Sequence, residues 1–247
     1  INDVLMSRID RLEDETRDLV KVASVIGRNF FHRILSEVAK SVQDIDNRLT
    51  HLKEIQLIRE RKRMEELEYL FKHALAQEAA YESILHQKRK EMHLQVAKSI
   101  ENVFKERLHE FYGMLALHYS KGEDYENAEH YLVKAGEEAI RSSASSEALN
   151  YYQEVLKLYL QSNKDEAEPE KLDMYEKKIA IALYNNSLWV EAVKHVDKVF
   201  EYWNIIASPN RFILVIKFIK NIIFITKGLD RISKRKRKIP IQRDNHI

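Results

Sequence analysis

The stretch Phe71-Lys72-His73-Ala74-Leu75-Ala76-Gln77-Glu78-Ala79-Ala80-Tyr81-Glu82-Ser83-Ile84-Leu85 decides the first expectation about the fold. Its first residues favour a strand, and after His73 the apolar residues follow the helical period. His73 is therefore predicted to open a helix. Because an imidazole can donate a hydrogen bond to phosphate, His73 is a candidate phosphate contact.

Four helices are predicted before this stretch, because apolar residues recur there at intervals of three and four. They cover residues 2–12, 13–26, about 30–39 and 41–54. Gly27 is expected to end the second helix in a left-handed conformation. Ser41 and Asp44 resemble a capping box that opens the fourth helix.

A small β-hairpin is predicted between the fourth helix and His73. Residues 55–59 and 69–72 favour strands, and they flank a charged tip, Arg61-Lys62-Arg63-Met64-Glu65-Glu66. Together with the preceding helices, this hairpin predicts a winged-helix module.

Helical repeats are predicted after the module. Helices continue to Leu85 and over residues 91–104, and from Tyr112 the spacing is similar to that of the 34-residue tetratricopeptide repeat. The positions that carry this spacing are Tyr112, Leu115, Ala116, Tyr119, Ala128 and Ala135. Degenerate units centre on Ala148 and Tyr152, and then on Ala180, Ala192 and Val196, with an acidic loop over residues 163–170. We therefore expect an all-α fold in two domains: residues 1–107, the winged-helix module with its hairpin, and residues 108–247, a tetratricopeptide-like superhelix.

The composition agrees with a helical fold and excludes several kinds of site. The chain has 247 residues, 45% hydrophobic, with five glycines and three prolines, which suffices for a sizeable helical core. It has no cysteine, so disulfides and thiolate sites are excluded. It also has no G-x-x-x-x-G-K-[ST] loop, so no ATP hydrolysis is predicted within these residues. A net charge of +2 argues against a generally basic nucleic-acid binder. Because the absence of cysteine fits a reducing compartment, we expect a cytoplasmic protein.

Several segments together resemble the signal-transduction ATPases with numerous domains, above all those associated with class III adenylate and guanylate cyclases. The segments are Val4 to Gly27, Leu57-Ile58, Tyr69 to His73, Met92-His93 through Ala97, and Gly122 to Ala135. The resemblance implies a non-catalytic regulatory and protein-interaction segment that follows a nucleotide-binding domain. Because the chain begins at Ile1 inside an amphipathic pattern, we expect it to be an internal part of a longer protein.

The resemblance also implies a nucleotide contact. In that family the histidine at the position of His73 contacts the β-phosphate of ADP, so ADP or ATP, with Mg²⁺, would be the ligand of the longer protein. A helix-capping or core histidine without a ligand is the alternative. The cations Arg59, Arg61, Lys62 and Arg63 could touch phosphates, but a solvated hairpin explains them as well.

Two other functions remain open. A stand-alone repeat scaffold would bind a protein or peptide partner, with Tyr112, Tyr119, Tyr151 and Tyr152 as candidate contacts, although tyrosines at helical spacing usually pack between helices. A DNA-binding regulator would use residues 44–54 as its recognition helix, but Asp44, Asp46 and Glu54 on that helix disfavour nucleic acid.

Neither a metal site nor a membrane span is predicted. His86 and His93 share no ligand set such as H-E-x-x-H. Residues 212–225, FILVIKFIKNIIFI, are too short for a span, so we expect a buried repeat helix. A membrane-surface helix over residues 212–238 is the alternative, because a basic run, Lys234-Arg235-Lys236-Arg237-Lys238, follows the apolar segment.

Overall fold

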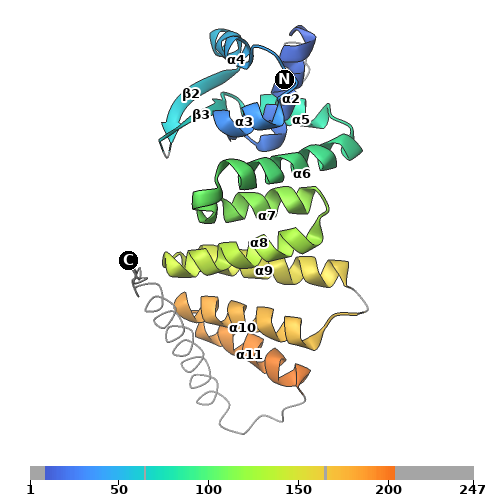
Figure 1. Ribbon diagram of the computed structural model, residues 1–247. Helices are drawn as coiled ribbons and strands as arrows, with labels where there is room; N and C mark the ends of the chain where they lie inside the picture. The colour runs from blue at the N-terminus through green and yellow to red at the C-terminus, as the bar shows by residue number, and fades with distance from the viewer. Residues whose placement is uncertain (1–8, 64, 164–165, 204–247) are drawn as a thin grey trace, which may run out of the picture. The chain divides into compact units, whose positions relative to one another are not determined.

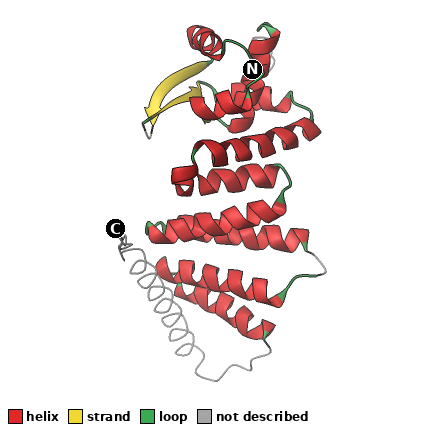
Figure 2. Cartoon of the chain, viewed as in Figure 1, coloured by secondary structure: helices red, strands yellow, loops and turns green. Residues whose placement is uncertain are grey.

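The computed structural model describes residues 9–63, 65–163 and 166–203. Within them the chain is mainly helical, with one small antiparallel sheet (Figures 1 and 2). The chain divides into two compact units, Ile1–Ala135 and Gly136–Ile247. The predicted helix over residues 2–12 and the apolar segment over residues 212–225 lie wholly or mostly outside the described residues.

The first unit begins with a helix, a strand, two helices and two strands, and then continues as helices. Its elements are α2 (Asp14–Ile26), β1 (Asn29–Phe31), α3 (His32–Val38), α4 (Ile45–Glu54), β2 (Ile58–Arg63), β3 (Glu66–Phe71), α5 (Ala74–Glu82), α6 (His86–Val103), the 3₁₀ segment η1 (Lys105–Phe111) and α7 (Tyr112–Lys121). Helix α8 (Tyr125–Arg141) contains the division between the units.

The sheet has three strands in the order β1-β3-β2, and both pairings are antiparallel. The expected hairpin is present as β2 and β3, but its strands are longer than predicted. Residues 61–63 and 66, expected in the tip, pair across the hairpin, for example Arg61 opposite Glu68. Strand β1 lies where a helix from about residue 30 was expected, because Asn29–Phe31 finds its partner in β3, far along the sequence.

Two predicted helix caps take other forms. Helix α4 begins at Ile45 after Asp44, which has φ 54° and makes no side-chain capping bond, so the capping box from Ser41 is wrong. Gly27 follows α2 with φ 140° and ψ −176°. This positive φ favours glycine, but it is not the left-handed helical conformation that was expected.

An aromatic cluster packs on either side of residue 107, where the boundary between the domains was expected. The rings of Phe104 and Phe111 stack with centroids 4.2 Å apart, and Phe31 packs edge-on against both. Since Phe31 ends β1 while Phe104 precedes η1 and Phe111 ends it, the cluster joins the sheet to the helices that follow it. The first compact unit as a whole runs to Ala135.

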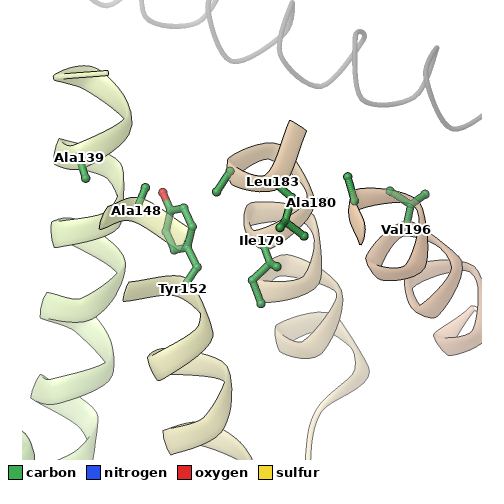
Figure 3. Packing of buried hydrophobic residues seen from close by; sticks show 9 residues of the cluster. Ala139, Ala148, Tyr152, Ile179, Ala180, Leu183 and Val196 are labelled. Atoms are coloured by element: carbon green, nitrogen blue, oxygen red, sulfur yellow. The ribbon is translucent and has the colours of Figure 1, made fainter. Parts of the chain in front are cut away.

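As far as Trp203, where the description ends, the second unit contains the end of α8 and three further helices, α9 (Ser145–Ser162), α10 (Pro169–Asn185) and α11 (Trp189–Tyr202). Helix α10 packs against both α9 and α11. The core between them is built from alanines and a few larger side chains, including Ala148, Tyr152, Ile179, Ala180 and Val196 (Figure 3). All five predicted centres of the degenerate repeats lie in this core, since Ala192 is buried there as well.

Three helix connections share one turn geometry. The middle residues of the turns after α7, α8 and α10 are Glu123, Ser143 and Ser187, with φ between 60° and 65°. In each turn the next backbone N–H donates to a carbonyl five residues back, for example Ala144 to Ala139 at 2.8 Å. This is the bond pattern of a Schellman motif, made here without glycine at the left-handed position.

Candidate functional site

The second unit carries a groove of about 370 Å³ bounded by α9, α10 and α11. Ile179 of α10 lies fully buried, while Leu160 of α9 is 44% exposed. The groove is lined by Gln153, Leu156, Lys157, Leu160, Gln161, Ile179 and His195. It therefore combines an apolar surface with polar side chains.

The helical period of α9 creates one side of this groove. The five α9 residues in the lining recur at intervals of three and four, so they occupy one face of the helix. Another face carries Ala148, Tyr152, Val155 and Tyr159, which are buried. The groove was not predicted from the sequence. The signal for it is a second apolar stripe on α9, formed by Leu156 and Leu160.

A buried carboxylate anchors the side of the groove that α11 provides. Glu176 of α10 is 1% exposed. It accepts hydrogen bonds from His195 Nδ1 and, at 3.0 Å, from Lys198 Nζ. Burial alone would raise the pKa of Glu176, but these hydrogen bonds and positive charges lower it on balance. The ionised carboxylate thus fixes the proton of His195 on Nδ1 and holds the ring at the groove.

The ionisable side chains that line the groove are both basic types, Lys157 and His195. Lys198, which is 48% exposed on its side chain, lies beside them through its bond to Glu176. Because the Glu176 carboxylate is enclosed, the charge that the described lining residues can present at the groove is positive or neutral. The arrangement suits binding of an apolar segment that also carries carboxylates.

The structure places His73 on the surface of the first unit. It is exposed at the N-terminal end of α5, with φ −121° and ψ 126°, and its side chain makes no capping hydrogen bond. Its carbonyl accepts the Ala76 N–H at 3.1 Å. The imidazole is therefore accessible at a helix N-terminus, as the sequence predicts.

The four candidate tyrosines differ in exposure. Tyr119 and Tyr152 are each 3% exposed, so their rings pack inside the units and do not face a partner. Tyr112 and Tyr151 are half-buried. Tyr112 packs beside Tyr131, and the Tyr151 hydroxyl donates to Glu147 at 3.0 Å. None of the four lines the groove.

The candidate DNA contacts on α4 are engaged within the protein. Arg48 forms ion pairs with Glu13, at 2.9 Å, and with Glu15, and only 13% of its side chain is exposed. Lys53 donates to Glu60 at 2.7 Å.

A hollow of about 580 Å³ adjoins the N-terminus of the same helix. It is polar and is lined by His32, Ser36, Val42, Asp44, Ile45, Asp46 and Asn47. The carboxylates of Asp44 and Asp46 would repel the phosphates of a nucleic acid at this end of α4.

The arginines of the β2–β3 hairpin are also partly neutralised. Arg61 and Arg63 both bond to Glu68, whose side chain is 1% exposed, with the Arg63 contact at 3.2 Å. This observation favours the solvated-hairpin interpretation of these two cations over a phosphate-binding one.

In the described parts of the chain, no group of three or more His, Cys, Asp or Glu side chains is arranged to hold a metal ion. The helices that the structure describes include none with the length and hydropathy needed to cross a membrane. No protein-family model, curated protein or solved structure matches the chain significantly.

Proposed function

We propose that this chain is a non-catalytic regulatory segment that binds a protein partner in the groove of its second unit. One observation carries the proposal: the same groove presents the apolar side chains of exposed Leu160 and half-buried Leu156 and the basic side chains of Lys157 and His195. Its occupant would be an amphipathic peptide or helix with leucine-like side chains and at least one carboxylate. Apolar anchors supply most of the binding free energy in such interfaces, and complementary charge supplies orientation.

Two features support a repeat architecture for this segment. The same three-residue turn recurs after α7, α8 and α10, and small residues such as Ala148 and Ala192 lie where neighbouring helices meet. These features are those expected of tetratricopeptide-like hairpins, which often bind peptides along their helices.

Selection of displayed peptides on the whole chain tests partner binding. We expect the selected sequences to be amphipathic and acidic. Leu160→Glu should abolish their binding, because it places a carboxylate among the apolar side chains of the groove. Leu117→Glu is the matched control, since Leu117 is 50% exposed on α7 in the other unit. Peptides that bind equally to both variants, or the absence of any selected peptide, would contradict the proposal.

Within this regulatory role, we place the chain in a signalling ATPase associated with a nucleotide cyclase. The order helix, strand, two helices, two strands supports a winged helix. The exposure of His73, between the end of β3 and the start of α5, supports an ADP contact. The nucleotide-binding domain would be the second partner. A stand-alone scaffold would share the groove but would not depend on His73.

The DNA-binding alternative has less support. Its two candidate cations, Arg48 and Lys53, are held by carboxylates of the same unit. We therefore expect no specific duplex binding at physiological salt. This alternative would be restored if the chain bound duplex DNA in a salt-sensitive way and if charge reversal at Arg48 and Lys53 removed that binding.

A further inference from the structure

Two histidines of the first unit form a buried chain with a tyrosine. The Nδ1 atoms of His93 on α6 and His118 on α7 are 2.9 Å apart, and the Tyr81 hydroxyl of α5 lies 3.0 Å from His93 Nε2. His93 is 5% exposed and His118 is 1% exposed. Three helices thus meet through polar atoms inside the unit.

One of the two Nδ1 atoms must donate to the other, because two N–H groups or two unprotonated nitrogens would repel each other at this distance. The Ile26 carbonyl at the end of α2 favours a proton on the His118 ring, but the buried His118 Nε2 makes no hydrogen bond. The contact between the two rings therefore needs one donating and one accepting Nδ1, which two neutral imidazoles supply.

A further proton on either imidazole is unfavourable in the native structure. A proton added to the accepting Nδ1 would set two N–H groups against each other across the 2.9 Å contact. A positive charge on His93 would also lie near the cations Lys121 of α7 and Arg89 of α6. The Arg89 guanidinium already lies 4.9 Å from the centre of the Tyr81 ring.

We propose that the Tyr81–His93–His118 chain is an acid-sensitive lock, which holds α5 to α6 and α7 while both rings are neutral and opens this contact when the rings gain protons. The lock is independent of the partner-binding and nucleotide-binding functions proposed above. It would make the first unit responsive to acidification through groups that are not on its surface.

The expected size of the effect follows from burial. Burial, with the nearby cations, lowers the pKa of His93 to about 4, and burial with the neighbouring His93 lowers that of His118 to about 3. Histidines of the unfolded chain have a pKa near 6.5, so below this pH the unfolded chain binds protons that the native unit does not bind. The free energy of unfolding therefore keeps its full value above a pH of about 6.5 and decreases as the pH falls below it. At pH 5 the folding equilibrium would lose roughly 30-fold per ring, on the order of 10³ for both.

Amide hydrogen exchange of α6 and α7 in the whole chain measures this loss. The test variant is His93→Phe with His118→Leu, which replaces both partners by apolar groups so that neither ring is left unpaired. The matched control is His86→Gln, because His86 is exposed at the start of the same α6. We expect protection, corrected for intrinsic exchange, to fall between pH 7.5 and 5 by about 10³ in the wild type and in the control. Protection in the test variant should fall far less, and an equal fall in all three proteins would overturn the proposal.

A second measurement needs no variant and serves if the double substitution prevents folding. Nitrogen NMR of ¹⁵N-histidine-labelled wild type reports the tautomer and charge of each ring. At pH 6 we expect each ring to be neutral, with one of the two Nδ1 atoms protonated and the other not. A charged ring at either position at this pH would overturn the lock.

Discussion

Gly136 faces the ring of Tyr152: a Cβ atom on Gly136 would lie 2.3 Å from Tyr152 Cε1. The contact joins the end of α8 to α9 within the second unit. A helical glycine normally costs stability relative to alanine, by about 1 kcal/mol. Here the absence of a side chain allows a large buried ring to occupy the space between the two helices.

Replacing Gly136 by alanine should therefore destabilise the second unit. Overpacking costs about 1–3 kcal/mol, which exceeds the gain in helix propensity. Urea unfolding followed by a probe in the second unit measures the change. In the background Tyr152→Leu the ring is absent, and there Gly136→Ala should no longer destabilise. If the substitution stabilises both backgrounds equally, the close approach does not matter energetically.

Removing the buried charge at Glu176 should weaken the same unit and alter its response to acid. Glu176→Gln replaces charge-assisted hydrogen bonds to His195 and Lys198 by weaker ones, at a cost of about 1.5–3 kcal/mol. Because the pKa of Glu176 is lowered on balance in the native state, its contribution is present above the ordinary value near 4.5. That contribution is lost as the pH falls through the lowered pKa.

The pH dependence of unfolding in the wild type and in Glu176→Gln checks this sign. The two curves should differ most at neutral pH and converge in acid. Glu191→Gln, an exposed position at the start of α11, is the control and should follow the wild type. A constant difference between wild type and Glu176→Gln down to pH 2 would contradict the assigned ionisation.

His73→Ala should affect nucleotide retention without affecting stability. The side chain is exposed and makes no capping bond, so the free energy of unfolding should change by less than about 0.5 kcal/mol. In a chain that also contains the proposed nucleotide-binding domain, the ADP that copurifies should decrease, as measured by chromatography after denaturation. His86→Ala is the control at another exposed histidine. Unchanged ADP in His73→Ala would remove the phosphate contact from the proposal.

Two substitutions at a left-handed turn residue, Ser143, should change the stability of the second unit in opposite directions. Ser143 has φ 65°, a conformation that costs a residue with a Cβ roughly 1 kcal/mol. Ser143→Gly should stabilise the second unit by about 0.5 kcal/mol, after the larger entropy of glycine in the unfolded chain is subtracted. Ser143→Val should destabilise it, because a β-branched side chain tolerates this φ poorly. Thermal unfolding of the two variants should therefore shift in opposite directions from the wild type.

Sequence patterns located most helices because the helical period is a local property of the chain. Helix α2 was expected over 13–26 and is observed as Asp14–Ile26. The start of α5 after His73 was also predicted correctly. The turns at Glu123, Ser143 and Ser187 could not be located in this way, since they lack the glycine that usually marks a left-handed residue.

By itself, the sequence determined the helical class, the core positions such as Ala148 and Ala180, and the position of His73 at a helix start. These follow from periodicity, side-chain size and the absence of helix-breaking residues. Only the tertiary structure decided that Asn29–Phe31 is a strand, that Glu176 orients His195, and that His93 meets His118. Each of these depends on groups from separate elements, and a hydrogen bond or a change in pKa exists only when folding brings such groups together and removes water from them.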